Sequence, residues 1–157
     1  MVDQGRSSAV DAGQTHEQIV DACIARLNRD MTQEKLEQVF GQLIGALWLR
    51  ASRTLSEVTL DAIFERALFI SRERFPLLIA YQLDYKERRI TRSPSERTAT
   101  RHDVIDAFRH LIVTVLTLLG NLTADILLIG LYQELNTFLP VANSKNRKKY
   151  EGQQKAS

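Results

Sequence analysis

Three side chains that could bind a metal or carry protons lie at helical spacing in the second half of the chain. His102, Asp106 and His110 follow an i, i+4, i+8 pattern, so a helix would place them on one face. With His16 or Glu17 as a further ligand, such a face could hold a transition metal. The sequence has neither a Glu-x-x-His nor a His-Glu-x-x-His motif. We therefore expect exposed polar residues near a helix start, with no metal site and no cofactor.

A second row of polar side chains continues along the same segment, through Thr114, Thr117 and Asn121. This seam could line a pocket for a small hydrophobic molecule, although hydroxyls that bond back to their own helix explain it more simply. The chain contains no phosphate-binding glycine loop and no Gly-x-Ser-x-Gly motif. Its single cysteine, Cys23, falls on the apolar side of a predicted helix and reads as an inert core thiol. We expect no catalytic residue and no enzyme.

Hydroxyl residues mark the starts of the helices that would position these side chains. Thr32, Ser56 and Thr123 each follow an apolar residue and precede a leucine four positions on, which predicts an N-cap with a hydrophobic staple. Thr15 and Thr100 begin patterns of the capping-box type. The apolar periodicity predicts helices over about 15–29, 32–50, 56–74, 101–119 and 123–138. Residues 76–85 fit either a short helix or a buried strand, and 86–100 read as a loop.

The most apolar stretch, residues 111–131, carries one charge, at Asp125, and is long enough to span a membrane if it is continuous. Gly120 and Asn121 favour a break, with Gly120 just after one helix and Thr123 starting the next. Asp125 would then meet the positive end of a helix dipole, whereas it would be costly in the middle of a bilayer. We expect a buried helical hairpin, with one long buried helix or membrane insertion as alternatives.

Two segments of the first half resemble two of the second. Residues 39–48 align with 107–116, and 55–68 align with 122–135, each pair reading as helix, turn, helix. We expect an all-α bundle of five or six helices, built from helical hairpins with an internal pseudo-two-fold arrangement. Residues 15–139 would form this single domain, between a disordered lead (1–14) and a disordered basic tail (140–157). One cysteine and no visible signal peptide favour the cytoplasm.

The second hairpin is apolar nearly all round, so we expect a partner protomer to cover part of it. Gly41 and Gly45 have the Gly-x-x-x-Gly spacing, which predicts a close helix crossing within the domain or across a dimer. The candidate interface comprises Ile126, Leu127, Leu128, Ile129, Leu131, Gly41 and Gly45.

The net charge of +2 says less about partners than its distribution does. Residues 47–68 have the outline of a helix-turn-helix with a recognition helix over 56–70, but acidic groups at the start of that helix would face phosphate. We therefore expect no specific nucleic-acid binding. The favoured function is a regulatory or adaptor interaction module, in signalling, that acts through helix–helix contacts in a homo- or hetero-oligomer. A domain that binds a small hydrophobic ligand is the alternative, and membrane association through 111–131 is a third. The sequence leaves the partner and the oligomeric state open.

Overall fold

A computed structural model of the chain describes residues 16–27, 31–93 and 99–140. The described part is mostly helical and includes one small sheet of two strands, so the predicted class holds with an addition. The lead 1–14 and residues 141–157 of the predicted tail lie outside the described residues. The described elements are a helix over 16–25, α2 (Gln33–Ala51), α3 (Glu57–Arg74), the 3-10 helix η1 (Pro76–Ala80), β1 (Tyr81–Asp84), β2 (Arg89–Arg92), α4 (Arg101–Thr123) and α5 (Leu128–Thr137).

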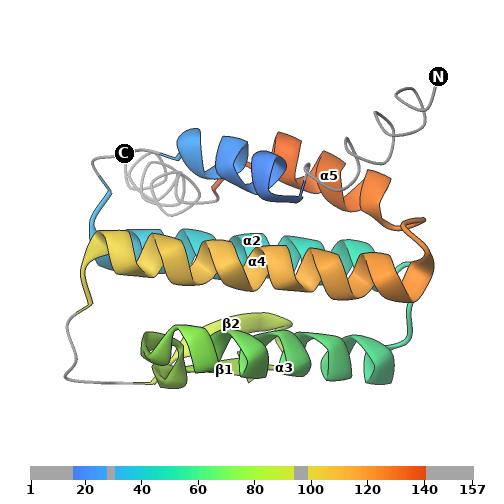
Figure 1. Cartoon of the computed structure of the whole chain (residues 1–157), viewed down its shortest axis with the longest axis horizontal. Helices are drawn as coiled ribbons and strands as arrows, with labels where there is room; N and C mark the ends of the chain where they lie inside the picture. Colours follow the sequence, from blue (N-terminus) through green and yellow to red (C-terminus); the bar gives the residue numbers. More distant parts are fainter. Residues whose placement is uncertain (1–15, 28–30, 94–98, 141–157) are drawn as a thin grey trace, which may run out of the picture.

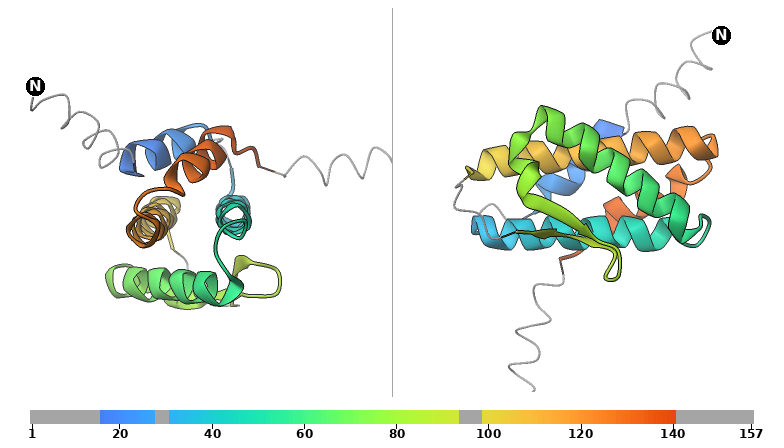
Figure 2. Two further views of the ribbon diagram at one scale, coloured as in Figure 1. Left: turned by 90° about the vertical axis from the view of Figure 1, so that its right-hand side faces the viewer. Right: turned by 90° about the horizontal axis from the view of Figure 1, so that it is seen from below.

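The helices are stacked in three layers (Figure 1, Figure 2). In the middle layer α2 and α4 lie side by side and run in the same direction. One outer layer holds α5 and the helix 16–25; the other holds α3 and the β-hairpin. Arg26 holds α5 and the helix 16–25 together in their outer layer, because its guanidinium donates hydrogen bonds to the carbonyl oxygens of Leu135 and Asn136 at the end of α5. Those carbonyls would otherwise lack helical partners.

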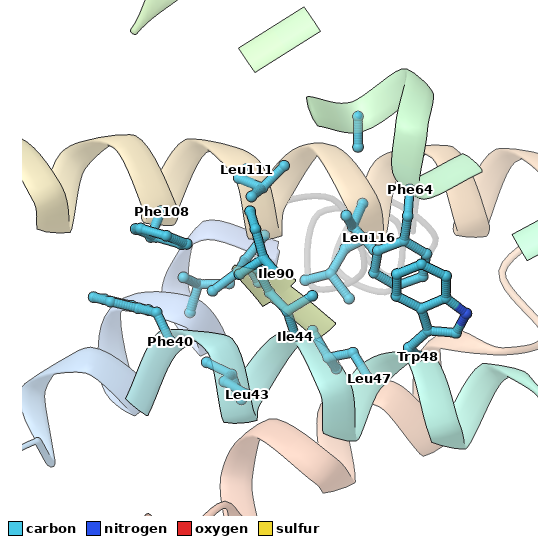
Figure 3. Packing of buried hydrophobic residues seen from close by; sticks show 14 of the residues in the cluster. Phe40, Leu43, Ile44, Leu47, Trp48, Phe64, Ile90, Phe108, Leu111 and Leu116 are labelled. Carbon is cyan, nitrogen blue, oxygen red and sulfur yellow. The ribbon is translucent and has the colours of Figure 1, made fainter. Parts of the chain in front are cut away.

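Aromatic pairs join the layers in the core. The rings of Phe40 on α2 and Phe108 on α4 stack with centroids 4.9 Å apart and planes 7° apart. Tyr81, at the start of β1, meets Phe108 edge-on. Trp48 stacks on Phe64 of α3 (Figure 3). Such pairs stabilise a fold by about 0.5–1.5 kcal/mol beyond the area they bury. The middle layer is therefore anchored to the layer of α3 and the β-hairpin through Trp48 of α2 and Phe108 of α4.

The predicted N-caps are confirmed at three positions. The hydroxyl oxygens of Thr32, Ser56 and Thr100 accept hydrogen bonds from backbone N–H groups at the starts of α2, α3 and α4. The predicted cap at Thr123 is wrong. Thr123 is the last residue of α4, where its hydroxyl donates to the carbonyl oxygen of Leu119 and accepts a long hydrogen bond, 3.4 Å, from the N–H of Leu127 in the following turn.

The predicted hairpin in residues 101–138 is present, but its turn lies later than expected. Gly120 is inside α4, not just beyond its end, and α4 continues to Thr123. Gly120 is useful there because its missing side chain leaves room for the returning chain. A β-carbon at Gly120 would stand 2.9 Å from a carboxylate oxygen of Asp125 and 3.3 Å from a methyl group of Leu128. Asp125 lies in the turn itself, so the prediction that it sits in the first turn of a helix is also wrong.

Residues 76–93 contain both structures that the sequence left open, a 3-10 turn followed by a strand. Pro76 opens η1, and β1 then pairs antiparallel with β2, with Tyr81 opposite Arg92. The prediction that 86–100 is all loop is wrong for Arg89–Arg92. The hairpin closes because the carboxylate of Asp84 accepts hydrogen bonds from the N–H groups of Lys86 and Glu87, a turn that aspartate favours.

Gly41 and Gly45 do form a close contact, but with a strand and not with another helix. A β-carbon at Gly41 would stand 3.3 Å from the carbonyl oxygen of Ile90, and one at Gly45 would stand 3.2 Å from that of Arg88. The predicted close helix crossing at these glycines is therefore wrong. The two glycines let the backbone of β2 and of the turn before it lie directly on α2, where Ile90 is buried.

Candidate functional site

The three histidines do not converge on one site. The Nε2 atom of His102 lies 3.3 Å from a carboxylate oxygen of Asp106 on the surface of α4. His110 instead turns toward α3, with Nδ1 3.0 Å from the hydroxyl of the buried Ser71. His16 hydrogen-bonds to the hydroxyl of Tyr132 on α5, at 2.7 Å. Within the described residues, His, Cys, Asp and Glu side chains form no group of three or more that could hold a metal ion.

The predicted ligand seam is a row of side chains on the surface of α4. The hydroxyls of Thr114 and Thr117 donate to the carbonyl oxygens of His110 and Val113, which is the simpler explanation that the sequence allowed. Thr117 and Asn121 are exposed. None of these residues lines the pockets described below. If the protein binds a small molecule, this seam is a poor place for it.

The candidate interface residues of the second hairpin divide into two groups. Leu127, Leu128 and Leu131 are buried within the chain itself, so the hairpin exposes less apolar surface than its sequence indicates. Ile126 and Ile129 are not: their exposed fractions are 76% and 71%. Leu122, the last residue but one of α4, is 55% exposed. We call Leu122, Ile126 and Ile129 the apolar tip. Helix periodicity does not single out Leu122, because it lies on the side of α4 away from the core.

The turn that carries the apolar tip has an unusual backbone. Ala124 and Asp125 are consecutive residues in the left-handed region, with φ of 50° and 66°. Neither is glycine, and this conformation costs an L-residue about 1–2 kcal/mol. The backbone N–H of Asp125 is satisfied by the carbonyl oxygen of Gly120, at 2.8 Å. Strain of this kind persists where the surrounding structure imposes it, and it is common at binding surfaces.

Polar groups surround the apolar tip on two sides. His16 lies close enough to Asp125 for the carboxylate to affect its protonation: burial lowers the pKa of His16, and the charge of Asp125 raises it in part. In α5, Gly130 follows Ile129, and the side chain of Arg50 from α2 lies against it and pairs with Glu134 at 3.5 Å, each side chain being 30% exposed. The chain around the apolar tip therefore carries the acidic Asp125 in the turn and meets the basic Arg50 at α5.

A membrane role for 111–131 would need a spanning helix. Among the helices of the described ranges, none is long and apolar enough to cross a membrane.

A second candidate site lies where η1 and the open end of the β-hairpin meet α2. A pocket of about 370 Å³ is walled mainly by apolar side chains, and a neighbouring pocket of about 650 Å³ follows the groove between α2 and β2. Both are lined by Glu37, Tyr81, Arg92 and Ser93. No sequence motif marks these residues, which come from three separate elements.

Glu37 organises the polar wall that the two pockets share. One guanidinium nitrogen of Arg92, Nη1, lies 3.2 Å and 3.1 Å from the two carboxylate oxygens of Glu37. Burial raises the pKa of Tyr81, and the hydrogen bond to Glu37 and its negative charge raise it further. Tyr81 therefore stays a neutral hydroxyl. A third, smaller pocket of about 190 Å³ lies near Leu27 and Ile105.

Together these features define a mostly helical fold with an exposed apolar turn and an amphipathic pocket. Comparison with protein-family models, with curated proteins and with solved structures found no match.

Proposed function

We propose that the protein is a non-enzymatic interaction module of regulatory or adaptor type, and that it pairs with a second copy of itself through the apolar tip. The observation that carries the proposal is the turn 124–127. There the chain accepts two strained residues, and Ile126 and Ile129 stay exposed beside them. Leaving large aliphatic side chains in water forgoes about 1.5–3 kcal/mol each. A surface that combines strain with exposed apolar area is typical of a contact site.

A second copy suits this surface because the polar groups beside it have both signs. A two-fold contact brings each residue of one protomer against the same patch of the other, so the patch must be complementary to itself. Arg50 and Glu134 are paired at 3.5 Å and partly exposed, and the Arg50 side chain lies against Gly130, the residue after Ile129. Around a two-fold axis, Arg50 of one copy can approach Glu134 of the other while the isoleucines meet in the centre.

Two similar helical hairpins already pack against each other inside one chain, much as two copies would in a dimer. We infer that the two helical hairpins form a bundle with a pseudo-two-fold arrangement, as the aligned segments predict. In support, α2 and α4 run in the same direction, α3 packs on α4, and α5 packs on α2. Phe40 and Phe108, which occupy equivalent positions in the aligned segments, stack on each other. A protein built this way already contains one pairing of similar surfaces.

The test is the molar mass in solution, measured by light scattering over a dilution series. We expect a dimer at high concentration, and a monomer at all concentrations for the variant Ile126→Asp/Ile129→Asp. The control is Ile79→Asp, which adds a charge at a site that is 65% exposed in η1, and should leave the dimer intact. A wild-type protein that stays monomeric throughout would contradict the proposal.

A further inference from the structure

The pocket between η1 and the β-hairpin has the composition of a small-molecule site. Its volume of about 370 Å³ falls in the range of ligand pockets, and most of its wall is apolar. The apolar wall comprises Pro76, Leu77, Ile79, Ala80 and Ala99. Ile79 stands at its rim with 65% of its surface exposed, although it is a large aliphatic residue. The wall can therefore receive an apolar body that excludes water from these side chains.

The polar side of the same pocket selects the charge of the ligand. It carries one carboxylate, Glu37, and one guanidinium, Arg92, and these are paired. The two differ in access: the side chain of Glu37 is 10% exposed and that of Arg92 is 33% exposed. A ligand entering from solvent meets the cation first. Glu37 therefore positions the site and does not contact the ligand: it binds Nη1 of Arg92 and accepts a hydrogen bond from Tyr81.

We propose that this pocket binds a small carboxylate with an apolar body of about six to ten carbons, a size that suits a pocket of this volume. The ligand carboxylate lies against the exposed part of the Arg92 side chain and accepts a charge-assisted hydrogen bond from its guanidinium. The aliphatic chain lies among Leu77, Ile79 and Ala80. This site is built from other elements than the apolar tip, so it stands or falls independently of self-association.

Calorimetric titration of the full chain with octanoate tests the proposal. We expect saturable binding with one molecule per chain. Hexanoate should bind about fifteen times more weakly, since each buried methylene tightens binding about fourfold. Octan-1-ol, which keeps the chain and lacks the charge, should bind about ten times more weakly or worse. No saturable binding of octanoate at millimolar concentration, or equal binding of octanol, would overturn the proposal.

Variants locate the site. Arg92→Gln should weaken octanoate binding about tenfold or more. Its matched control is Arg88→Gln, because Arg88 belongs to the same hairpin, pairs with Glu57 and is 34% exposed, yet it lines neither pocket. Ala80→Leu fills the apolar end and leaves the Glu37–Arg92 pair intact, so its loss of binding does not depend on that pair. Ile126→Asp should bind octanoate normally. Equal affinity in Arg92→Gln and Arg88→Gln, or unchanged affinity in Ala80→Leu, would refute the assignment.

Discussion

The carbonyl oxygen of Arg88 lies so close to Gly45 that a β-carbon added there would stand 3.2 Å from it. The oxygen belongs to the turn of the β-hairpin, where Arg88 itself has a φ of 54°. It can move only if this turn moves. Gly130 in α5 offers the opposite case, since a β-carbon there would meet the side chain of Arg50, 2.8 Å from Nε. A long side chain can turn away at little cost.

These two glycines should therefore respond differently to alanine. In a helix alanine is favoured over glycine by about 1 kcal/mol, and overpacking against a fixed neighbour costs about 1–3 kcal/mol. We expect Gly130→Ala to raise the free energy of unfolding by up to about 1 kcal/mol and Gly45→Ala to lower it by about 1 kcal/mol. Urea unfolding of both variants measures the difference. Equal stabilisation of the two would mean that the β-hairpin is not held against α2.

Ala124 provides a test of the strain at the apolar tip. Its φ of 50° suits glycine better than alanine, so we expect Ala124→Gly to stabilise the protein by about 0.5–1 kcal/mol. The same substitution at Ala62, an exposed position in α3, should instead destabilise it by about 1 kcal/mol. The comparison uses one chemical change at two backbone conformations. A loss of stability at both positions would show that residue 124 is not left-handed in solution.

Removing the hydroxyls at the predicted helix starts should lower stability at three positions and much less at the fourth. Thr32→Ala, Ser56→Ala and Thr100→Ala should each cost about 1 kcal/mol in thermal or urea unfolding, because each removes the acceptor for a backbone N–H at a helix start. Thr123→Ala should cost less, about 0.5 kcal/mol or below, since the Thr123 hydroxyl donates back into α4 and its hydrogen bond from the N–H of Leu127 is long, at 3.4 Å. A cost at Thr123 as large as at Thr32 would favour the turn position that the sequence predicts.

Thr123 also shows why local patterns place helix starts well and turns less well. A cap depends on residues within one turn of each other, so the patterns at Thr32, Ser56 and Thr100 are sufficient. The end of α4 depends on which residues the returning helix can pack against. Leu128 packs next to Gly120, and this contact fixes the turn later than glycine alone indicates.

The candidate sites were less accessible to sequence reasoning than the helices. The Glu37–Tyr81–Arg92 cluster joins α2, β1 and β2, and no periodicity relates residues so far apart in the chain. The glycine spacing at Gly41 and Gly45 correctly indicated a close backbone contact, but it could not say that the neighbour was a strand. The exposed isoleucines of the apolar tip were predicted among the interface candidates, and whether they form an interface stays a prediction.

Two histidines that join separate elements predict how stability depends on pH. Burial lowers the pKa of His110, and the charges of Arg74 and Arg109 lower it further. Burial also lowers the pKa of His16, with Asp125 acting in the opposite sense. Each imidazole is therefore harder to protonate in the folded chain than in the unfolded chain, where the pKa is about 6.5.

The sign of the effect follows from proton uptake. Between pH 7.5 and 6.0 the unfolded chain binds more protons than the folded one, so the free energy of unfolding falls as the pH falls through this range. Because both rings are partly exposed, we expect about a few tenths of a kcal/mol from each. Urea midpoints at pH 7.5 and 6.0 should differ less in His16→Gln and His110→Gln than in the wild type. His102→Gln is the comparison, because His102 is exposed and pairs with Asp106 of its own helix. If His110→Gln keeps the full pH dependence, burial and the charges of Arg74 and Arg109 do not hold the ring in its neutral form.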